Sequence, residues 1–350
     1  MKATVYVKKG DVEIQNVEKP AVKTPNDAVI KVVRACVCGS DLWFYRGIHE
    51  FYKPGTVVGH EAIGIVDSVG ENVTNVKPGD FVIVPFTHGC GHCAACKAGF
   101  DSDCLNTDPT RSITTGYQAE YLRTENANWA LVKIPGQPSD YSDDQLKDLL
   151  TLADVMATGY HAAKSAEVKP GSTAAVIGDG AVGLCGVIGA KLLGASKIIL
   201  LSHHEDRAKL GREFGATDIV STKGGQAVQD VKALTEDQAG ADAVLECVGA
   251  TSAIEQAGQI ARPGAVIGRV GVPEVEPKAN QLFFRNVGLR GGTAPVTTYD
   301  RGRLLKEVLD GNIHPGKVFT KQFTLDHVKD AYDAMDQRKA IKSLLVVSNG

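Results

Sequence analysis

Hydrophobic and polar positions follow two different patterns along the chain. Up to about residue 150, short apolar runs such as 28–33 and 81–85 are separated by Gly, Pro and Asp, which is typical of β-strands joined by turns. From residue 154 to about residue 270, short apolar runs alternate with helix-like segments of about ten to fifteen residues. This alternation predicts βαβ units and a parallel sheet with helices on both faces.

The second pattern is regular enough to predict individual elements. Strands are expected at 174–177, 197–201, 218–220, 243–247 and 265–270, and helices at 156–163, 181–193, 205–214, 226–235 and 252–260. A helix-like segment at 300–309 and a strand at 343–347 are expected to return to the first domain. We therefore predict a β-rich domain of residues 1–153 and 295–350, interrupted by an α/β domain of residues 154–294.

Composition limits the possible function classes without naming one. The chain is 43% hydrophobic and 23% charged, with a formal net charge of −3, so no strong attraction to nucleic acid or to an anionic membrane surface is expected. No apolar run approaches the ~18 residues of a membrane span. The charged, strand-like segment 1–10 does not resemble a signal peptide. We expect a cytoplasmic protein that binds neither nucleic acid nor membranes.

Half of the eight cysteines lie within one short segment, 88–106. Thiolates at two-residue spacing can converge on one tetrahedral ion, with bonds of about 2.3 Å, and fill its coordination completely. A closed site leaves no position for water or substrate, so this segment predicts a structural zinc lobe and places the chemistry elsewhere. The expected ligands are Cys90, Cys93, Cys96 and Cys104.

Other uses of these cysteines fit the sequence less well. Two disulfides suit small secreted domains that lack a core. Iron–sulfur proteins usually carry a C-x2-C-x2-C-x3-C-P run, which differs from the C-x2-C-x2-C-x7-C spacing here. A nucleic-acid-binding zinc ribbon has two separated C-x2-C pairs and a basic surface, whereas these cysteines form one group in a chain of negative net charge. Zinc is the preferred interpretation.

A dinucleotide site is predicted where the first strand of the second domain meets its helix. A G-x-G-x-x-G motif there follows an apolar run and opens a predicted helix, the context in which this short motif is informative. Gly178 would make the tight turn, Gly180 would let the pyrophosphate approach the backbone, and Gly183 would let the helix pack on the strand. Ala181 and Val182 begin the helix, whose free N–H groups would hold phosphates. A glycine-rich turn without a ligand is the alternative.

The residues after the next predicted strand bear on the choice of cofactor. NAD-specific sites place Asp or Glu on the ribose hydroxyls about twenty residues after the glycine motif. Ser202 stands at that position, and its neutral hydroxyl tolerates the 2′-phosphate of NADP(H). His203, His204 and Arg207 follow as donors or positive charges, so NADP(H) is favoured over NAD(H). Alternatively, the histidines are plain surface residues, or Glu205 reaches the ribose if the strand ends later.

Three further residues outside the cysteine lobe predict a reactive metal. Cys38, His60 and Asp154 offer a thiolate, an imidazole and a carboxylate, which together can supply the three protein ligands of a catalytic zinc with an open fourth position. Such a zinc lowers the pKa of an alcohol, so that hydride can leave its carbon for a nicotinamide ring. Taken singly each residue is weak evidence, because a cysteine such as Cys38 is often an ordinary core thiol.

The residues around His60 resemble a family signature. The signature of the zinc-containing alcohol dehydrogenases, in the medium-chain dehydrogenase/reductase superfamily, is matched by Gly59-His60-Glu61-x2-Gly64-x5-Gly70-x2-Val73. The cysteine lobe and the glycine motif follow in the family's order and spacing, and the resemblance covers essentially the whole chain. It implies a GroES-like β-rich catalytic domain interrupted by a Rossmann domain. It also implies that Cys38, His60 and Asp154 hold a catalytic zinc, with Glu61 as an exchangeable or supporting carboxylate.

Some details place the chain within this family. Many relatives carry Cys where Asp154 stands, and the Asp version is similar to a bacterial secondary-alcohol branch that is often NADP-linked. Polyol branches usually carry Glu followed by Pro there, whereas Val155 follows here. Segments 201–219 and 282–296 resemble a formaldehyde-dehydrogenase-like subgroup. Formaldehyde, amino-alcohol and polyol oxidation therefore stay as alternatives to general alcohol oxidation.

The resemblance also implies roles for residues beside the substrate. Ser40 corresponds to the Ser or Thr that accepts the alcohol proton, and Asp41 to a group that orients the metal ligands by hydrogen bonding. Many relatives carry a relay histidine three residues after this serine, where Trp43 stands here. Proton exit through a ribose hydroxyl, through water or through His49 is left open.

The nicotinamide half of the cofactor is expected beside Thr158 and the strand ends at Val248 and Val270. The sequence thus predicts a zinc-dependent NAD(P)-linked oxidoreductase that interconverts alcohols with aldehydes or ketones and binds two zinc ions per chain. The resemblance implies a homo-oligomer, either a dimer or a tetramer. The alternative from another class is a non-catalytic cofactor-binding scaffold, which has no need of three convergent metal ligands.

Overall fold

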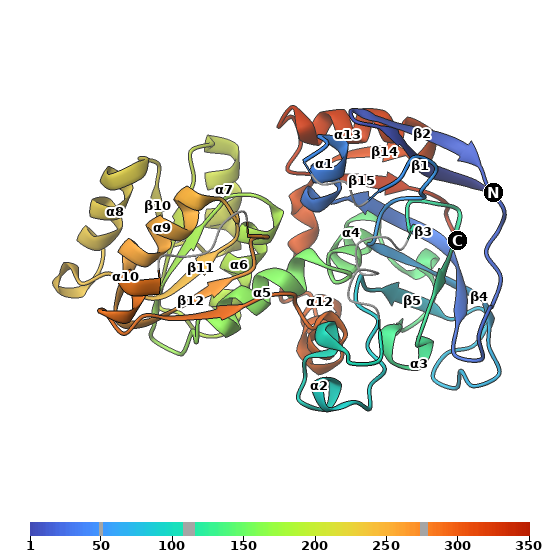
Figure 1. Ribbon diagram of the computed structural model, residues 1–350, viewed down its shortest axis with the longest axis horizontal. Coiled ribbons are helices and arrows are strands. Elements are labelled where there is room, and N and C mark those ends of the chain that lie inside the picture. The colour runs from blue at the N-terminus through green and yellow to red at the C-terminus, as the bar shows by residue number, and fades with distance from the viewer. Residues whose placement is uncertain (49–51, 108–115, 274–278) are drawn as a thin grey trace. The chain divides into compact units, whose positions relative to one another are not determined.

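The computed structural model describes residues 1–48, 52–107, 116–273 and 279–350. Within these residues the chain forms two compact units (Figure 1). One comprises Met1–Asp154 and Pro295–Gly350, and the other comprises Val155–Ala294. The first unit therefore contains both termini, and each unit is built around a β-sheet of its own.

The first unit is built on a sheet in which the strand order is β14-β15-β3-β4-β5-β7, with β6 also paired to β3. The neighbours run antiparallel except for β14 and β15, which are parallel. A separate antiparallel pair joins β1 and β2. The strands are β1 Lys2–Lys8, β2 Asp11–Asn16, β3 Ala28–Val37, β4 Ala62–Val69, β5 Phe81–Val84, β6 Tyr121–Thr124, β7 Val132–Ile134, β14 Phe319–Thr324 and β15 Lys342–Val346.

β3 is the central strand of this unit. Its sequence AVIKVVRACV is almost wholly apolar, and nearly every residue is buried, as expected for a strand covered on both faces. β15 lies beside it in antiparallel register, with Leu344 opposite Cys36. This pairing brings the C-terminal part of the chain next to the segment that carries Cys38.

The helices of the first unit are short. The segment 300–309, expected to form one helix, is a π-helical turn at Asp300–Leu304 followed by α12 Leu305–Leu309. α4 (Asp143–Thr151) begins with a capping box, because Ser142 Oγ accepts from the Gln145 N–H while the Gln145 side chain accepts from the Ser142 N–H. The other α-helices in the described part of this unit are α1 Gly39–Tyr45, α2 Ala94–Lys97, α3 Ala127–Ala130, α11 Val296–Tyr299 and α13 Val328–Asp336.

The described part of the second unit contains a six-stranded sheet in the order β10-β9-β8-β11-β12-β13, with all neighbours parallel. Numbered within the unit, this is the 3-2-1-4-5-6 order of doubly wound dinucleotide-binding domains. The elements are α5 Val155–Ser165, β8 Thr173–Ile177, α6 Ala181–Leu192, β9 Lys197–Leu201, α7 Glu205–Phe214, β10 Asp218–Val220, α8 Gly224–Ala233, β11 Ala241–Glu246, α9 Thr251–Ile260, β12 Ala261–Arg269, α10 Ala279–Phe283 and β13 Gly288–Gly291.

This architecture confirms the predicted fold class, a doubly wound α/β sheet combined with a β-rich domain. β12 begins at Ala261 rather than at 265, because the ladder with β11 shifts register after Ala241 and accommodates the Pro263-Gly264 step instead of ending there. Among the described helices, none has both the length and the apolar character that a bilayer crossing requires.

Candidate functional site

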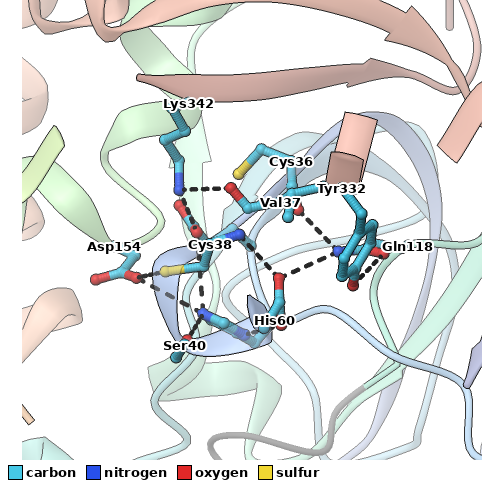
Figure 2. Close-up of polar contacts among 11 residues, drawn as sticks. Cys36, Val37, Cys38, Ser40, His60, Gln118, Asp154, Tyr332 and Lys342 are labelled. Atoms are coloured by element: carbon cyan, nitrogen blue, oxygen red, sulfur yellow. Dashed lines mark hydrogen bonds and ion pairs between the residues drawn. The ribbon is translucent and has the colours of Figure 1, made fainter. Parts of the chain in front are cut away.

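Four buried side chains with metal-binding groups meet in the first unit (Figure 2). Their ligand atoms all lie within 4.8 Å of one another, and the residues are Cys38, His60, Glu61 and Asp154. Cys38 follows β3 and is the N-cap of α1. His60 and Glu61 directly precede β4, and Asp154 directly precedes α5. The structure thus brings together the three ligands and the supporting carboxylate that the sequence predicted.

The separations in this cluster suit a single ion. Cys38 Sγ lies 3.4 Å from Asp154 Oδ2, and His60 Nε2 lies 3.7 Å from the same oxygen. Glu61 Oε1 is slightly farther, 3.9 Å from His60 Nε2. Ligand atoms on a tetrahedral zinc with bonds of about 2.0–2.3 Å are about 3.3–3.8 Å apart. The distances and the mixture of sulfur, nitrogen and oxygen donors both fit zinc.

Asp41 lies on the far side of the His60 ring. Its Oδ1 lies 3.4 Å from His60 Nδ1, while its Oδ2 accepts from the Cys38 N–H at 2.8 Å and from Gln118 Nε2 at 3.2 Å. Tyr332 in turn donates its hydroxyl to Gln118 Oε1 at 3.1 Å (Figure 2). A carboxylate at Nδ1 leaves Nε2 directed at the cluster, which is how supporting groups orient histidine ligands.

Lys342 provides a buried positive charge beside the cluster. It begins β15, its side chain is 1% exposed, and its Nζ lies 2.7 Å from Glu61 Oε1. The same ammonium donates to the Val37 carbonyl at 3.3 Å. Glu61 Oε2 is buried and has no hydrogen-bond partner among the described residues. Glu61 is therefore fixed through one oxygen and has the other available.

The cluster carries an excess of negative charge. Burial raises the pKa of the Cys38 thiol, and the charges of Asp154 and Glu61 raise it further against the opposing effect of Lys342. Burial lowers the pKa of His60, but the charge of Asp41 and the contact with Asp154 bring it well above its ordinary value. A divalent cation would balance this charge, so the electrostatics and the donor set agree.

The structure places the predicted proton acceptor at the edge of the cluster. Ser40 Oγ lies 3.5 Å from His60 Nε2. Trp43 lies on α1 where many relatives carry a relay histidine, and its indole can donate a hydrogen bond but cannot accept a proton. His49, the other candidate in this segment, lies outside the described residues.

The cysteine lobe forms a second, separate group. The sulfur atoms of Cys90, Cys93, Cys96 and Cys104 lie within 4.8 Å of one another, and none is in a disulfide. This lobe is more exposed than the first cluster, since Cys90 and Cys93 are only partly buried. All its candidate ligands are thiols, so the donor set fits the closed tetrahedral zinc that the spacing predicted.

Backbone N–H groups point at these sulfurs. The N–H groups of Cys93 and Cys96 lie 3.4 and 3.5 Å from the sulfurs of Cys90 and Cys93, and those of Cys90 and Asn106 lie 3.3 and 3.4 Å from Cys104 Sγ. Bonds from the backbone, chiefly from Cys96, lower the pKa of Cys93 to about 6. Burial raises the pKa of Cys96 to about 12. The loop thus already stabilises thiolate at one ligand, which metal binding requires.

In the second unit, the glycine motif forms the turn from β8 to α6. Gly178 has a φ of +109°, which a side chain disfavours. A Cβ on Gly183 would stand 1.9 Å from the Gly178 carbonyl oxygen, whereas a Cβ on Gly180 would meet nothing within 4 Å. Gly180 is also the N-cap of α6, which continues through Ala181 and Val182. The open space at Gly180 and the helix N-terminus leave room for a phosphate group.

The predicted adenosine-ribose residues are arranged around Asp179. Ser202 Oγ donates to Asp179 Oδ2 at 2.8 Å, and His204 Nδ1 lies 2.8 Å from the same oxygen. Arg207 Nη1 donates to Asp179 Oδ1 at 3.2 Å. His203 is separate from this group, because its Nδ1 lies 2.8 Å from the Ser221 carbonyl.

The predicted nicotinamide residues lie at the ends of β11 and β12 and on α5. The Glu246 side chain accepts from the Val248 and Gly249 N–H groups at 2.8 and 2.7 Å, so it fixes the turn after β11. Val248 is 45% exposed. Val270 directly follows β12, and Thr158 lies on α5. Their contact with a cofactor stays a prediction.

Two family models match the chain. Residues 24–136 match the model described as an alcohol dehydrogenase GroES-like domain, and residues 181–304 match the one described as a zinc-binding dehydrogenase. The chain is 32% identical over 374 aligned positions to the uncharacterized zinc-type alcohol dehydrogenase-like protein AdhB of Bacillus subtilis, with 97% of each protein covered. The chain belongs to the zinc-containing alcohol dehydrogenases. The predicted membership of the medium-chain dehydrogenase/reductase superfamily is thereby confirmed.

Other dehydrogenases are similar to the chain over nearly its whole length. It is 29% identical to the glutathione-independent formaldehyde dehydrogenase of Bacillus subtilis, with 98% of this chain and 96% of that protein covered. The alcohol dehydrogenase TADH from Thermus sp. ATN1 superposes with a TM-score of 0.89 at 31% identity, covering 99% and 100%. A zinc-binding dehydrogenase from Sinorhizobium meliloti 1021, solved bound to NADP, has a TM-score of 0.83 at 26% identity and covers 99% of both chains.

Sequence reasoning missed two charged residues of this zinc-containing alcohol dehydrogenase. Lys342 lies 281 positions from Glu61, and no local pattern marks a lysine at the start of a strand as buried. Asp179 occupies a variable position of the glycine motif, although it is the shared partner of Ser202, His204 and Arg207. An acidic residue within a phosphate-binding turn was the signal available in the sequence.

Proposed function

We propose that this protein interconverts alcohols with aldehydes or ketones by hydride transfer to or from a nicotinamide dinucleotide. The observation that carries the proposal is the convergence of Cys38, His60 and Asp154 in a buried cluster. The glycine turn between β8 and α6, at the carboxyl end of a strand in a parallel sheet, supports a dinucleotide as the hydride donor or acceptor.

Cys38, His60 and Asp154 would hold the catalytic zinc, with Glu61 as the adjacent carboxylate. A zinc ion in such a site supplies Lewis acidity, which lowers the pKa of an alcohol. Asp41 Oδ1 lies 3.4 Å from His60 Nδ1, and its charge would favour the neutral tautomer with the proton on Nδ1, which leaves Nε2 free to bind. Lys342 neutralises Glu61 and holds it at the edge of the cluster.

Ser40 is proposed to accept the proton that leaves the alcohol. Its hydroxyl can accept and donate at once, and it lies 3.5 Å from His60 Nε2. Because Trp43 cannot continue a proton relay, the next acceptor is proposed to be water or a ribose hydroxyl. Trp43 is proposed to narrow the substrate pocket instead.

The cysteine lobe is proposed to hold a second, structural zinc. Four thiol ligands support this role, because they would leave no coordination position for substrate. Such a site contributes to folding free energy rather than to the chemical step.

NADP(H) is proposed as the favoured cofactor. The neutral Ser202 hydroxyl, the partly exposed His204 and the Arg207 guanidinium support it, since together they offer donors and positive charge for a 2′-phosphate. The NADP bound to the Sinorhizobium meliloti relative is a further reason to test it.

Formaldehyde oxidation is a second candidate reaction. The full-length likeness to a glutathione-independent formaldehyde dehydrogenase favours it. Amino-alcohol and polyol oxidation stay as predictions from the sequence.

The cytoplasmic location and a homo-oligomeric state, dimer or tetramer, are proposals too. Strongly exposed Phe283 and Phe284 support assembly, because large exposed apolar side chains favour contact with another surface.

A substrate panel tests the proposed function. Zinc-loaded protein is incubated with primary and secondary alcohols, formaldehyde, threonine and a polyol, each with NADP+ and with NAD+, and reduced cofactor is followed by absorbance. We expect turnover of simple alcohols with a lower KM for NADP+ than for NAD+. Zinc-loaded protein that binds a dinucleotide but turns over none of these substrates would contradict the proposal and favour the non-catalytic scaffold.

A further inference from the structure

The Asp179 carboxylate is the centre of a polar cluster in the second unit. It accepts from Ser202 Oγ at 2.8 Å and from Arg207 Nη1 at 3.2 Å, and His204 Nδ1 lies 2.8 Å from it. The Asp179 side chain is 14% exposed and that of Arg207 is 13% exposed, so solvent screens this contact only partly. One protein anion thus contacts all three groups proposed to bind a 2′-phosphate.

The topology explains why an acid stands there. β8 and β9 are parallel neighbours, with Ile177 opposite Leu201, so the turns that follow them meet at the same edge of the sheet. Dinucleotide-binding sheets hold the adenosine ribose at this edge and, in NAD-specific sites, supply a carboxylate from the end of the second strand. Here the end of β9 offers Ser202, and the carboxylate comes instead from the glycine turn after β8.

We propose that Asp179 is the specificity-determining residue of the cofactor site, and that it limits the preference for NADP(H) by occupying the groups that would bind the 2′-phosphate. The proposal rests on the dinucleotide-binding function proposed above. A 2′-phosphate carries negative charge, so it must either displace Asp179 from Ser202, His204 and Arg207 or bind close to a like charge. The 2′-hydroxyl of NAD(H) is neutral, so it neither has to displace Asp179 nor is repelled by its charge.

Asp179 is ionised at neutral pH, which this role requires. Burial raises its pKa, but the bonds from His204 and Ser202 and the charge of Arg207 outweigh burial and bring the pKa below its ordinary value. Neutralising the residue would release the three donors and remove one negative charge beside them. The alternative is that Asp179 only stabilises the conformation of the glycine turn. In that case its substitution would weaken the binding of all adenine nucleotides equally.

Calorimetric titration with two fragments distinguishes these roles without requiring catalysis. The zinc-loaded full chain is titrated with adenosine 2′,5′-bisphosphate and with adenosine 5′-monophosphate, which differ only in the 2′-phosphate. We expect Asp179→Asn to tighten binding of the bisphosphate by about tenfold, as for removal of one partly screened charge within hydrogen-bond distance, and to change monophosphate binding by less than about threefold.

Asp206→Asn is the matched control. Asp206 is an exposed residue in the first turn of α7, next to Arg207 in sequence, so this substitution removes the same charge outside the cluster. We expect it to change the ratio of the two dissociation constants by less than about twofold. Asp179→Ser, which removes the charge but keeps a hydrogen-bonding group, should reproduce the effect of Asp179→Asn.

The proposal is overturned if Asp179→Asn and Asp179→Ser leave the ratio unchanged, if they weaken both fragments equally, or if Asp206→Asn shifts it as much. A wild-type protein that binds the monophosphate more tightly than the bisphosphate would instead contradict the proposed NADP(H) preference. The change in the ratio of the two dissociation constants in the Asp179 variants would still decide the role of Asp179.

Discussion

The two candidate metal groups of the first unit differ in donors, burial and charge. The cysteine lobe comes from one short segment, is partly exposed, and offers sulfur alone. The other cluster comes from three separate segments, is buried, and combines sulfur, nitrogen and oxygen with a buried lysine beside it. One short segment can bring four thiols together by itself, whereas the mixed cluster depends on contacts between distant segments.

This difference indicates what each group contributes. Cysteine sulfurs that accept from local backbone N–H groups can bind an ion without help from distant residues, so the lobe is expected to affect stability. In the mixed cluster, Asp41 lies beside His60 and Lys342 binds Glu61, so both candidate ligands are positioned toward the same point. A catalytic metal site requires such positioning of its ligands. The predictions below test this division from the largest expected effect to the smallest.

The largest effect is expected from His60→Ala. Loss of this ligand should lower kcat/KM for alcohol oxidation by about 1,000-fold or more, because metal Lewis acidity contributes several kcal/mol to the transition state. The exposed His327 provides the matched control, and His327→Ala should leave kcat/KM within about twofold. Steady-state kinetics at equal protein concentration, after the same zinc loading, measures both. Retention of activity in His60→Ala would contradict the assignment.

The next effect is expected from Lys342→Met. This change leaves Glu61 buried without its cation, and breaking a buried ion pair in this way costs about 3–5 kcal/mol of unfolding free energy. Lys342→Arg keeps the charge and should recover part of that loss. Denaturant unfolding should also show that added zinc offsets the loss in Lys342→Met, since a second cation would compensate Glu61. A Lys342→Met protein as stable as wild type would show that this ion pair is dispensable.

A smaller effect on stability, with little on chemistry, is expected from Cys93→Ser. The variant should lose the lobe zinc and melt about 5 °C lower, corresponding to about 2 kcal/mol in a domain of this size. Lys97→Ala, at an exposed position on α2 in the same lobe, is the control and should melt as the wild type does. Kinetics below the melting transition should stay within about threefold of wild type. An inactive Cys93→Ser protein of wild-type stability would overturn the division between the two groups.

The features that the sequence predicted are local ones. The cysteine lobe, the glycine turn and the segment at His60 were each recognisable, because their functional groups lie a few residues apart and the local backbone positions them. The fold class followed from hydrophobic periodicity, and α7 has the predicted bounds Glu205–Phe214. Local patterns of this kind can be recognised without knowing any tertiary contact.

The residues that sequence reasoning missed depend on long-range packing. Lys342 reaches Glu61 only because β15 pairs with β3. Tyr332 supports Gln118 across 214 positions, and Asp179 meets Ser202 because two turns share a sheet edge. The first half of the helix expected at 300–309 is a π-helical turn, which contains the buried Asp300. No local pattern of polar and apolar residues encodes such contacts.

The smallest effect is expected from Asp300→Asn. Both Asp300 carboxylate oxygens are buried without a partner among the described residues, and burial together with the charge of Asp101 raises the pKa of Asp300 well above its ordinary value. A raised folded-state pKa gives stability that is complete below the ordinary carboxyl pKa and is lost as pH rises through the folded value. Asp300→Asn removes that dependence, so its stability relative to wild type should increase by about 1–2 kcal/mol between pH 4 and pH 8.

Chemical denaturation across this pH range measures the difference, and Asp326→Asn serves as an exposed control. Asp101 belongs to the loop of the cysteine lobe and bonds to the Thr298 N–H at 3.2 Å. The result therefore reports on the part of the protein that anchors the lobe. A stability difference that does not change with pH would show that Asp300 is not held neutral.

The central claim is that the two groups bind separate zinc ions, of which the buried mixed cluster alone supports catalysis. The most direct test is the zinc content per chain of wild type, His60→Ala and Cys93→Ser, measured by elemental analysis on the samples used for kinetics. We predict two ions in the wild type, one for each group, and one in each variant, with activity lost in His60→Ala and kept in Cys93→Ser. One ion in the wild type, or activity that follows the cysteine lobe instead of His60, would contradict the account.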